Sequence, residues 1–530
     1  MTAHAPAGRD AVAPGVAPGV GDPGSTTNAV RGVSTLVGDT ASMFGGRLAS
    51  IALSFLSVLM TTRLLHAVGY GRVAYFTVVA MLIFTVTSGW TSAAVARYGR
   101  EEMELRGSLF TTSWNRLLIM TPLFLLAAAV VPLLKVLHAL PPEFSWVFVW
   151  LVLAYGATLV VGEHVRYLLE ASGRMKLSAL GIVCQQAAFV AAVGAVAVTG
   201  APRTPLMVIS LSLAALLGVT IVFGTAIRRI ALWPAQLDRA LLRRMLYFSL
   251  PLVAFTASQY VVQAVDLIII RAFKSPTQVG VYAFAYQAFT TLQAPATVAP
   301  QILTPLFVSA RTANTEGLVR RYFDRVVPQA TFVASCLLGL VIPLLGIAVP
   351  AVFGGGFRAS AGPLALLLIG LLFVFVSNLL APVIILHERT RSVALLNAVG
   401  ATINVVGDIV LLGPLHAGIL AAAGATAACF LVIACGYFFV GRTCVESTSR
   451  FPPELILPAV APAIPVLLFG GVTGIVTGLG LWIVTCALLL AFARVFVQTD
   501  VELIERLRMP APAKRAAYRG IALATRWALR

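Results

Sequence analysis

The chain has 530 residues, of which 59% are hydrophobic and only 11% are charged, and its mean hydropathy is +0.93. A soluble protein of this length needs far more polar residues to cover its surface, so the composition excludes that class and indicates a polytopic membrane protein. The net charge of +18 would favour nucleic-acid binding in a soluble chain. Here the basic residues lie in short loops beside apolar stretches, and we expect no nucleic-acid partner.

Residues 1–32 are rich in Ala, Pro and Gly and lack the apolar core of a signal peptide, so we expect a disordered cytoplasmic tail. About fourteen apolar stretches follow, each long enough to cross a bilayer as a helix. The sequence therefore predicts an all-α polytopic membrane protein with about 14 transmembrane helices. The predicted spans lie near 36–62, 72–96, 114–136, 145–163, 177–199, 206–228, 247–271, 278–308, 326–350, 361–386, 392–413, 417–441, 455–474 and 476–497.

The Lys and Arg residues predict the orientation of these spans. An even number of spans places both termini on one side, and 31 of the 38 basic residues fall on that side. Positive loops favour the cytoplasm, so both termini are expected there. The seven residues on the other side are Arg63, Arg72, Lys135, Arg203, Arg271, Lys274 and Arg358.

An internal repeat divides the chain. The stretch TTRLLHAVGYGRVAYF, around the end of the first span, is similar to IIRAFKSPTQVGVYAF, about 209 residues and six spans later. Because an even number of spans separates the copies, the two halves are expected to have the same orientation, and pseudo-symmetric halves of this kind commonly enclose a central cavity. The predicted units are a tail (1–32), two pseudo-symmetric six-helix halves (33–230 and 231–442), two further helices (443–497) and a basic cytoplasmic tail (498–530).

Charged residues inside the spans are the first candidates for function, because each costs roughly 2.5 to 3.5 kcal/mol to insert. The first span carries Asp39 and Arg47, the seventh Asp266 and the eleventh Asp408. A buried charge needs a partner or water, so we favour a functional role for Arg47, Asp266 and Asp408. Arg271 lies at the outer end of the seventh span, where snorkelling to the membrane surface is the simpler explanation.

Neutral polar residues form stripes on three predicted helices, in the seventh, eighth and eleventh spans. Such stripes can line a water-filled cavity or hydrogen-bond between packed helices, and the pattern leaves both explanations open. Their members are Gln259, Gln263, Tyr282, Tyr286, Gln293, Asn397 and Asn404.

Features of enzymes and metal sites are missing from the sequence. It contains no Walker loop, HExxH motif or nucleophile elbow, and Glu143 is the one acidic residue of the outer loops. The six cysteines form no CxxC motif, so we expect neither a disulfide framework nor a metal centre. We expect a transporter and no enzyme.

Four stretches, in order along the fourteen spans, resemble a known family. They are ASMFGGRLASIALSFLSVLMTTRLLHAVGYGRVAYF, LLEASGRMKLSAL, VDLIIIRAFKSPTQVGVYAFAYQAF and LLNAVGATINVVGDIVLLGPLHAGILAAAGATAA. Together they resemble the Wzx-type polysaccharide repeat-unit flippases of the multidrug/oligosaccharidyl-lipid/polysaccharide (MOP) exporter superfamily. The resemblance covers residues 36 to 497, with His66 where the family usually has Gly.

The resemblance implies flipping of a polyprenyl-pyrophosphate-linked oligosaccharide by alternating access through a polar cavity. Arg47 is the first choice for the pyrophosphate contact and Arg271 the second, and the neutral stripes would bind the glycan. Asp39, Asp266 and Asp408 would couple movement to a proton or sodium gradient, with no other cofactor.

The resemblance also implies a setting. It places the chain in the bacterial cytoplasmic membrane, among membrane lipids, beside a polysaccharide polymerase and glycosyltransferases. Two alternatives stay open: an ion-coupled multidrug antiporter of the same superfamily, and a non-transporting scaffold of a polysaccharide assembly complex. An antiporter would normally have twelve spans and a more aromatic, acidic binding site, and a scaffold would not need charges at membrane depth.

Overall fold

The computed structural model describes residues 23–141, 144–200, 202–297, 300, 303, 307, 316–448 and 451–492. Side chains are described from residue 49 onward, except those of 316, 318 and 492. Within these ranges the chain is helical apart from its turns and loops, and it contains no strand. The predicted basic tail, 498–530, lies outside them, as does the first part of the predicted N-terminal tail.

The first helix, α1 (Pro23–Thr87), contains both of the first two predicted spans. His66 divides it into two arms, because its backbone is left-handed there, with φ 55°. α1 begins inside the segment 1–32 that was predicted to be disordered. Pro23 is tolerated at the start of a helix, and no further proline occurs before Pro122.

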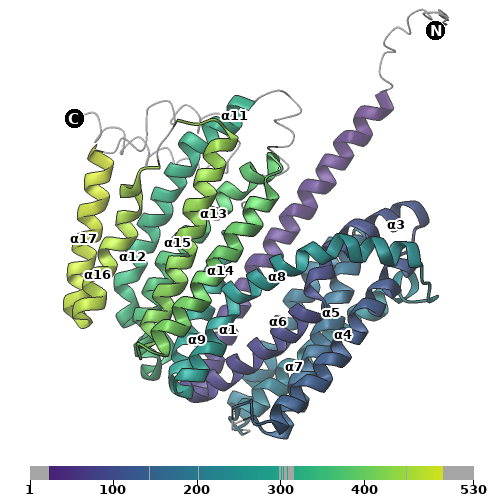
Figure 1. The fold of residues 1–530 in the computed structure, drawn as a ribbon, viewed down its shortest axis with the longest axis horizontal. Helices are drawn as coiled ribbons and strands as arrows, with labels where there is room; N and C mark the ends of the chain where they lie inside the picture. Colours follow the sequence, from purple (N-terminus) through teal and green to yellow (C-terminus); the bar gives the residue numbers. More distant parts are fainter. Residues whose placement is uncertain are drawn as a thin grey trace, which may run out of the picture.

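The rest of the first half, which with α1 we call the N-terminal lobe, is a set of helices at one side of Figure 1. Ser145 and Thr204 accept backbone N–H bonds at the starts of α5 and α7, as helix N-caps do. The elements are η1 (Gly89–Thr91), α2 (Ser92–Ala94), η2 (Val95–Gly99), α3 (Arg100–Arg106), α4 (Phe110–Val136), α5 (Trp146–Ala171), α6 (Met175–Thr199) and α7 (Pro205–Ala231).

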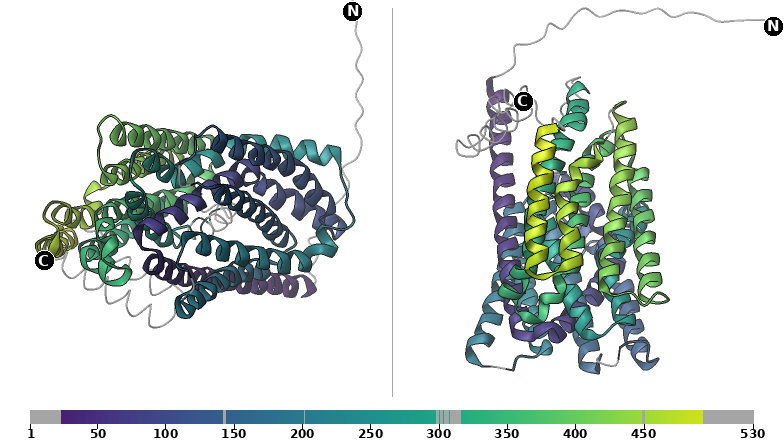
Figure 2. Two further views of the ribbon diagram at one scale, coloured as in Figure 1. Left: turned by 90° about the horizontal axis from the view of Figure 1, so that it is seen from below. Right: turned by 90° about the vertical axis from the view of Figure 1, so that its left-hand side faces the viewer.

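The second half, the C-terminal lobe, runs from α8 to α15, and a hairpin of α16 and α17 packs against α12 at its edge (Figures 1 and 2). The elements of the lobe are α8 (Arg239–Phe273), α9 (Pro276–Gln293), α11 (Glu316–Arg321), η3 (Tyr322–Val326), α12 (Val327–Phe353), η4 (Gly355–Ser360), α13 (Ala361–Leu386), α14 (Thr390–Leu412) and α15 (Ile419–Cys444). The hairpin elements are η5 (Pro453–Ile456), α16 (Leu457–Phe469) and α17 (Gly471–Phe492).

Two predicted boundaries were wrong. The eighth span was expected to run to residue 308, but α9 ends at Gln293, just before Pro295, which lies in a turn. The thirteenth was expected to end at residue 474, but Gly470 and Gly471 both have positive φ and end α16 at Phe469. In both places residues that break helices lie inside apolar runs, where hydropathy alone does not reveal them.

The number of helices agrees with the predicted fold class. Among the described residues, eleven helical segments are long and apolar enough to cross a membrane, so this is a multi-pass membrane protein. One of the eleven, Ala49–Thr87, covers both arms of α1. α9 is less apolar and α16 is short, and these two account for the remaining predicted spans.

The two copies of the sequence repeat meet where the lobes touch. Gly71 on α1 and Gly280 on α9 pack so closely that a Cβ at Gly280 would lie 1.8 Å from the Ala67 carbonyl oxygen. A Cβ at Gly71 would lie 2.7 Å from the Gly280 nitrogen. Corresponding positions that contact each other are expected near the axis relating two similar halves. The contact agrees with the pseudo-symmetric arrangement inferred from the repeat, which stays a prediction.

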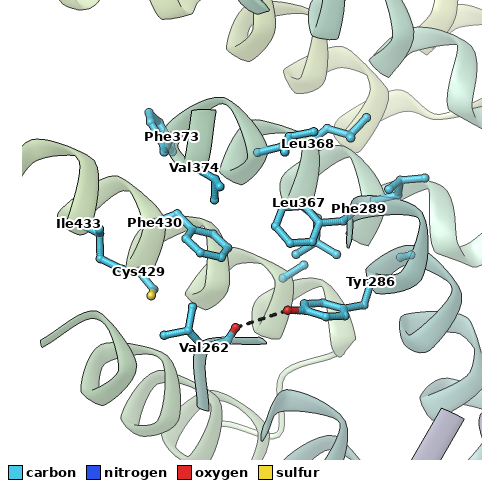
Figure 3. Packing of buried hydrophobic residues seen from close by; sticks show 14 of the residues in the cluster. Val262, Tyr286, Phe289, Leu367, Leu368, Phe373, Val374, Cys429, Phe430 and Ile433 are labelled. Atoms are coloured by element: carbon cyan, nitrogen blue, oxygen red, sulfur yellow. Dashed lines mark hydrogen bonds between the residues drawn. The ribbon is translucent and has the colours of Figure 1, made fainter. Parts of the chain in front are cut away.

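The largest buried apolar cluster lies in the C-terminal lobe, where α13 is covered by its neighbours. Phe289 of α9 and Phe430 of α15 pack with ring centroids 5.7 Å apart, beside Leu367 of α13 (Figure 3). This core fixes the positions of α8 and α9, which carry most of the predicted site residues, and of their neighbours α14 and α15.

Candidate functional site

A cavity of about 610 Å³ lies between the lobes at the level of the helices. Both arms of α1, together with α5 to α9, supply its wall. That volume is in the range of small-molecule sites. The wall has Ser, Thr and Tyr hydroxyls, and among the described lining residues it has no acidic or basic side chain. Its glutamines are Gln185, Gln186, Gln259, Gln263 and Gln287.

A second cavity, of about 420 Å³, continues from the first. The two share Ser54, Gln186, Gln287 and Thr290, and the second reaches Glu170 and Ala294, near the ends of α5 and α9. The end of the molecule that it approaches was predicted to face the cytoplasm.

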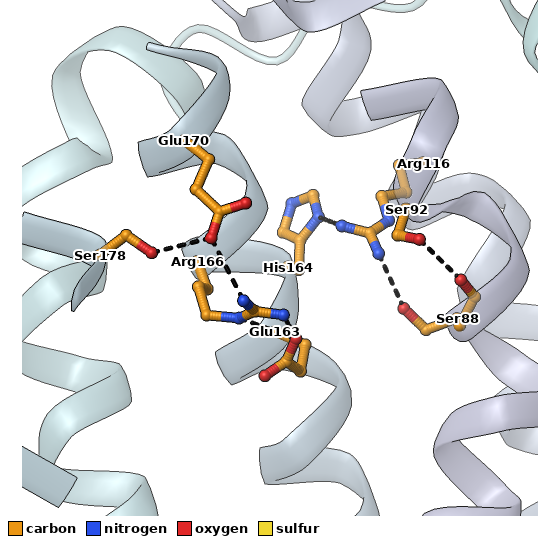
Figure 4. Close-up of polar contacts among 9 residues, drawn as sticks. Ser88, Ser92, Arg116, Glu163, His164, Arg166, Glu170 and Ser178 are labelled. Atoms are coloured by element: carbon orange, nitrogen blue, oxygen red, sulfur yellow. Dashed lines mark hydrogen bonds and ion pairs between the residues drawn. The ribbon is translucent and has the colours of Figure 1, made fainter. Parts of the chain in front are cut away.

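The second cavity contains a charged group that the sequence did not single out. Arg166 lines it and forms ion pairs with Glu163 and, at 3.2 Å, with Glu170 (Figure 4). Ser178 of α6 donates to the Glu170 carboxylate at 2.9 Å. The three charged residues come from one helix, α5, at i, i+3 and i+7, a spacing that brings them together.

The lobes are joined at the opposite end. Arg63 of α1 donates from Nε to the Val352 carbonyl at 2.8 Å and from Nη2 to the Ala351 carbonyl at 2.9 Å. These carbonyls belong to the last turn of α12, whose C-terminal dipole favours a cation. Tyr70 packs edge-on against Phe357 on the same side, with ring centroids 5.9 Å apart. The cavities are therefore closed near the Gly71 and Gly280 contact.

Three of the predicted amides form a chain in the wall. Gln263 donates to Gln259 at 3.2 Å, Gln259 donates to Asn397 at 2.9 Å, and Asn397 donates to the Tyr437 hydroxyl at 2.8 Å. Gln259 and Gln263 line the cavity, whereas Asn397 is buried behind them. Both explanations left open by the sequence apply, because these residues line a cavity and also connect α8 to α14.

Asp266 is the centre of a buried polar cluster beside the cavity. Its Oδ2 accepts from the Tyr282 hydroxyl at 2.6 Å and from the Thr426 hydroxyl at 2.8 Å, and its Oδ1 accepts from Asn404 at 2.5 Å. All four side chains are buried, and they come from α8, α9, α14 and α15.

Asp408 belongs to the same cluster but is bonded differently. It is fully buried, one turn after Asn404, and lies near enough to Asp266 for the two carboxyls to interact electrostatically. Yet neither of its oxygens has a hydrogen-bond partner of good geometry among the described residues, and the same is true of the Asn404 Oδ1 atom. Three buried oxygens thus remain without a donor in one cluster, which is the chemistry of a site for a cation or a proton.

The remaining predicted residues are spread over the molecule. Tyr286 lines the cavity, and its hydroxyl lies 3.5 Å from the Val262 carbonyl (Figure 3). Gln293 ends α9 and is half-buried. Arg271 lies in the last turn of α8, where it donates to the Lys274 carbonyl at 3.3 Å and borders a pocket of only about 10 Å³.

The structure does not describe the side chains of Asp39 and Arg47. The backbone of α1 passes through both positions. Arg47 comes one helical turn before Ser50 and Ile51, which line the second cavity. Its role as the first choice for a phosphate contact therefore stays a prediction.

Sequence reasoning missed Gln185, Gln186 and Gln287 in the cavity wall. Gln185 and Gln186 form a polar pair in the middle of an apolar span, and this pair was the available signal. It also missed the most deeply buried charge among the described side chains of the N-terminal lobe. Arg116 donates to the Ser88 hydroxyl at 3.1 Å and contacts His164 at 3.4 Å (Figure 4). It also donates to the Thr91 hydroxyl at 3.0 Å.

Residues 36–310, more than half of the chain, match the sequence profile of a family described as Polysaccharide biosynthesis protein. The chain belongs to this family. The family resemblance of the sequence motifs is thereby confirmed. No curated protein matches the chain.

The fold resembles that of solved transporters. The lipid II flippase MurJ, in an inward closed conformation, superimposes with a TM-score of 0.64 at 13% identity, over 86% of this chain and 99% of that one. An outward-facing multidrug resistance MATE transporter of the MOP superfamily gives 0.48 at 14% identity, over 78% and 96% of the two chains. Family and fold together indicate a membrane transporter.

Proposed function

We propose that the protein moves a polyprenyl-pyrophosphate-linked oligosaccharide from the inner to the outer leaflet of the bacterial cytoplasmic membrane. The observation that carries the proposal is the cavity of about 610 Å³ between the lobes, with five glutamines and many hydroxyls in its wall. Amide and hydroxyl groups can replace the water around a glycan, while the lipid tail stays in the bilayer. Membership of a polysaccharide biosynthesis family supports this substrate class.

The charge pattern favours this substrate over the cationic drug of an antiporter. An acidic wall would favour a lipophilic cation, whereas aromatic rings, such as Tyr155, Phe189 and Tyr260 of the main cavity, suit either substrate. In the main cavity the described wall has no carboxylate, and in the second cavity Glu170 is paired with Arg166. We propose that Arg47, next to the second cavity on α1, pairs with the pyrophosphate at first. Arg271, at the end of the molecule predicted to face outward, would pair with the pyrophosphate after the lobes have opened the cavity to that side.

The energy for movement would come from an ion. We propose that Asp266 and Asp408 bind a proton or a sodium ion, because their cluster leaves buried oxygens without donors. Asp266 lies one turn after Gln263 on α8, so a change at the carboxylates can move the cavity wall. The contacts of Arg63 close one end of the cavities. Ion binding at this cluster would shift the equilibrium between the states that open to either side of the membrane. Asp39 stays a third candidate on sequence grounds alone.

A matched pair of variants on α9 tests the cavity. Gln287→Leu removes an amide from both cavities, whereas Gln278→Leu changes an exposed glutamine at the start of the same helix. The readouts are surface polysaccharide in a strain lacking the protein, and translocation of lipid-linked oligosaccharide in vesicles. We expect Gln287→Leu to lower both at least roughly fivefold, the effect of about 1 kcal/mol lost from substrate binding, and Gln278→Leu to change neither.

Other results would contradict the proposal. Full activity of Gln287→Leu together with Arg47→Ala and Asp266→Ala would eliminate the cavity mechanism and favour a scaffold. Transport of an organic cation, without transport of the lipid-linked oligosaccharide, would favour the antiporter. We further propose that a polysaccharide polymerase and glycosyltransferases act beside the protein, which co-purification from membranes would test.

A further inference from the structure

A groove of about 420 Å³ lies on the outer surface of the C-terminal lobe, away from the two cavities between the lobes. Its lining comes from α13, α15 and three residues that precede α16, Phe451, Pro453 and Ile456. Phe438 and Phe439 supply aromatic wall, and Cys435 lies exposed within it. Phe439 is 62% exposed, so in a membrane this groove faces the bilayer.

One charged residue, Arg442, lines the groove at the end of α15. Its Nε donates to the Ser447 carbonyl at 3.0 Å, and its terminal nitrogens form no hydrogen bond or ion pair with the described residues. Arg389 acts electrostatically on Cys444 at the same end of α15, and so adds positive potential there. The site is therefore an apolar groove that ends at a cation with donors to spare.

We propose that this groove binds one anionic phospholipid, with an acyl chain along Phe438 and Phe439 and the phosphate on Arg442. The predicted orientation supports an anionic lipid, because α15 ends on the predicted cytoplasmic side, where the membrane surface is negatively charged. Arginine also pairs strongly with phosphate. The lipid would touch both the lobe and Phe451, Pro453 and Ile456 of the connection to α16. It would thus help to hold the α16–α17 hairpin against the lobe. The inference does not depend on the proposed transport function.

The experiment is native mass spectrometry of the full-length protein, delipidated in detergent and titrated with phosphatidylglycerol or phosphatidylcholine. We expect one phosphatidylglycerol to bind in preference to phosphatidylcholine. Arg442→Gln should weaken phosphatidylglycerol binding roughly tenfold, the effect of one charge-assisted hydrogen bond, and leave phosphatidylcholine unchanged. Arg229→Gln, an exposed arginine in the last turn of α7, is the matched charge control and should change neither.

A second pair of variants tests the groove without removing a charge. Cys435→Trp fills the groove and should abolish binding of both lipids, while Val432→Trp adds the same volume outside it, on the same helix, and should not. Equal affinity for the two lipids, or unchanged binding in both Arg442→Gln and Cys435→Trp, would overturn the proposal. Displacement of phosphatidylglycerol by an equimolar amount of polyprenyl phosphate would also overturn it, by assigning the groove to the substrate tail.

Discussion

Each lobe buries a charged residue, but the two lobes surround that charge differently. In the N-terminal lobe, Arg116 donates to Ser88 and Thr91 and contacts His164, and its charge is held by neutral groups of the same lobe. In the C-terminal lobe, Asp266 accepts three hydrogen bonds, but neighbouring Asp408 has no donor of good geometry among the described residues.

We interpret the contrast as the difference between a structural cluster and a functional one. A buried polar group without a partner costs about 1 to 3 kcal/mol, so such groups persist where an ion, proton or water completes them. Arg116 already has hydrogen-bond acceptors, and its guanidinium carbon also lies 5.2 Å from the Tyr167 ring centroid. We infer that the N-terminal cluster holds helices together, while the C-terminal cluster is completed by an ion during transport.

The largest effect is expected for Asp408→Asn. This change keeps the size of the side chain and removes the negative charge, so ion binding and its coupling to movement are lost. We expect transport in vesicles to fall roughly 5- to 150-fold, the range of ordinary coupling free energies. The free energy of unfolding should rise, because an unpaired buried carboxylate is removed.

The control for this prediction is Asn404→Leu, one turn earlier on α14. It removes a donor to Asp266 and should lower both stability and transport. If Asp408→Asn transports at the wild-type rate with unchanged ion dependence, then the two clusters do not differ in function.

A smaller effect, of a different kind, is expected for Arg116→Leu. The substitution leaves the Ser88 and Thr91 hydroxyls and His164 without their donor in a buried site. We expect unfolding to become easier by about 1 to 3 kcal/mol, measured by thermal unfolding in detergent. Transport per folded molecule should stay constant, and a lower rate at full stability would give this cluster a functional role.

The smallest effect is expected for Ser113→Ala. The Ser113 hydroxyl lies 3.1 Å from His164 Nε2, on the far side of the ring from Arg116. Removal of this one hydrogen bond should cost about 1 kcal/mol of stability and leave transport unchanged. The matched variant Thr426→Val removes one hydroxyl bonded to Asp266. It should reduce ion affinity more than stability, and equal behaviour of the two variants would weaken the comparison.

Some of these residues could be found from the sequence and others could not. Asp266 and Asp408 were visible because a carboxylate within an apolar span is rare. The sequence did not show that the two carboxylates lie close together, because 142 positions separate residues 266 and 408 in the chain. Arg166 and Arg116 lie near the ends of apolar stretches, where an arginine has the same sequence signature as a membrane anchor. Only their contacts distinguish them.

The sequence by itself determined the class, the number of helices, the repeat and the family. These features follow from hydropathy and repeated motifs, which can be read from the order of the residues without knowledge of how the helices pack. The tertiary structure decided which polar residues share a space. It brought Gln259 to Asn397, placed Asp266 among Tyr282, Asn404 and Thr426, and left Arg271 away from the main cavity. The physical reason is that a polar stripe fixes the face of a helix, whereas helix packing decides what that face meets.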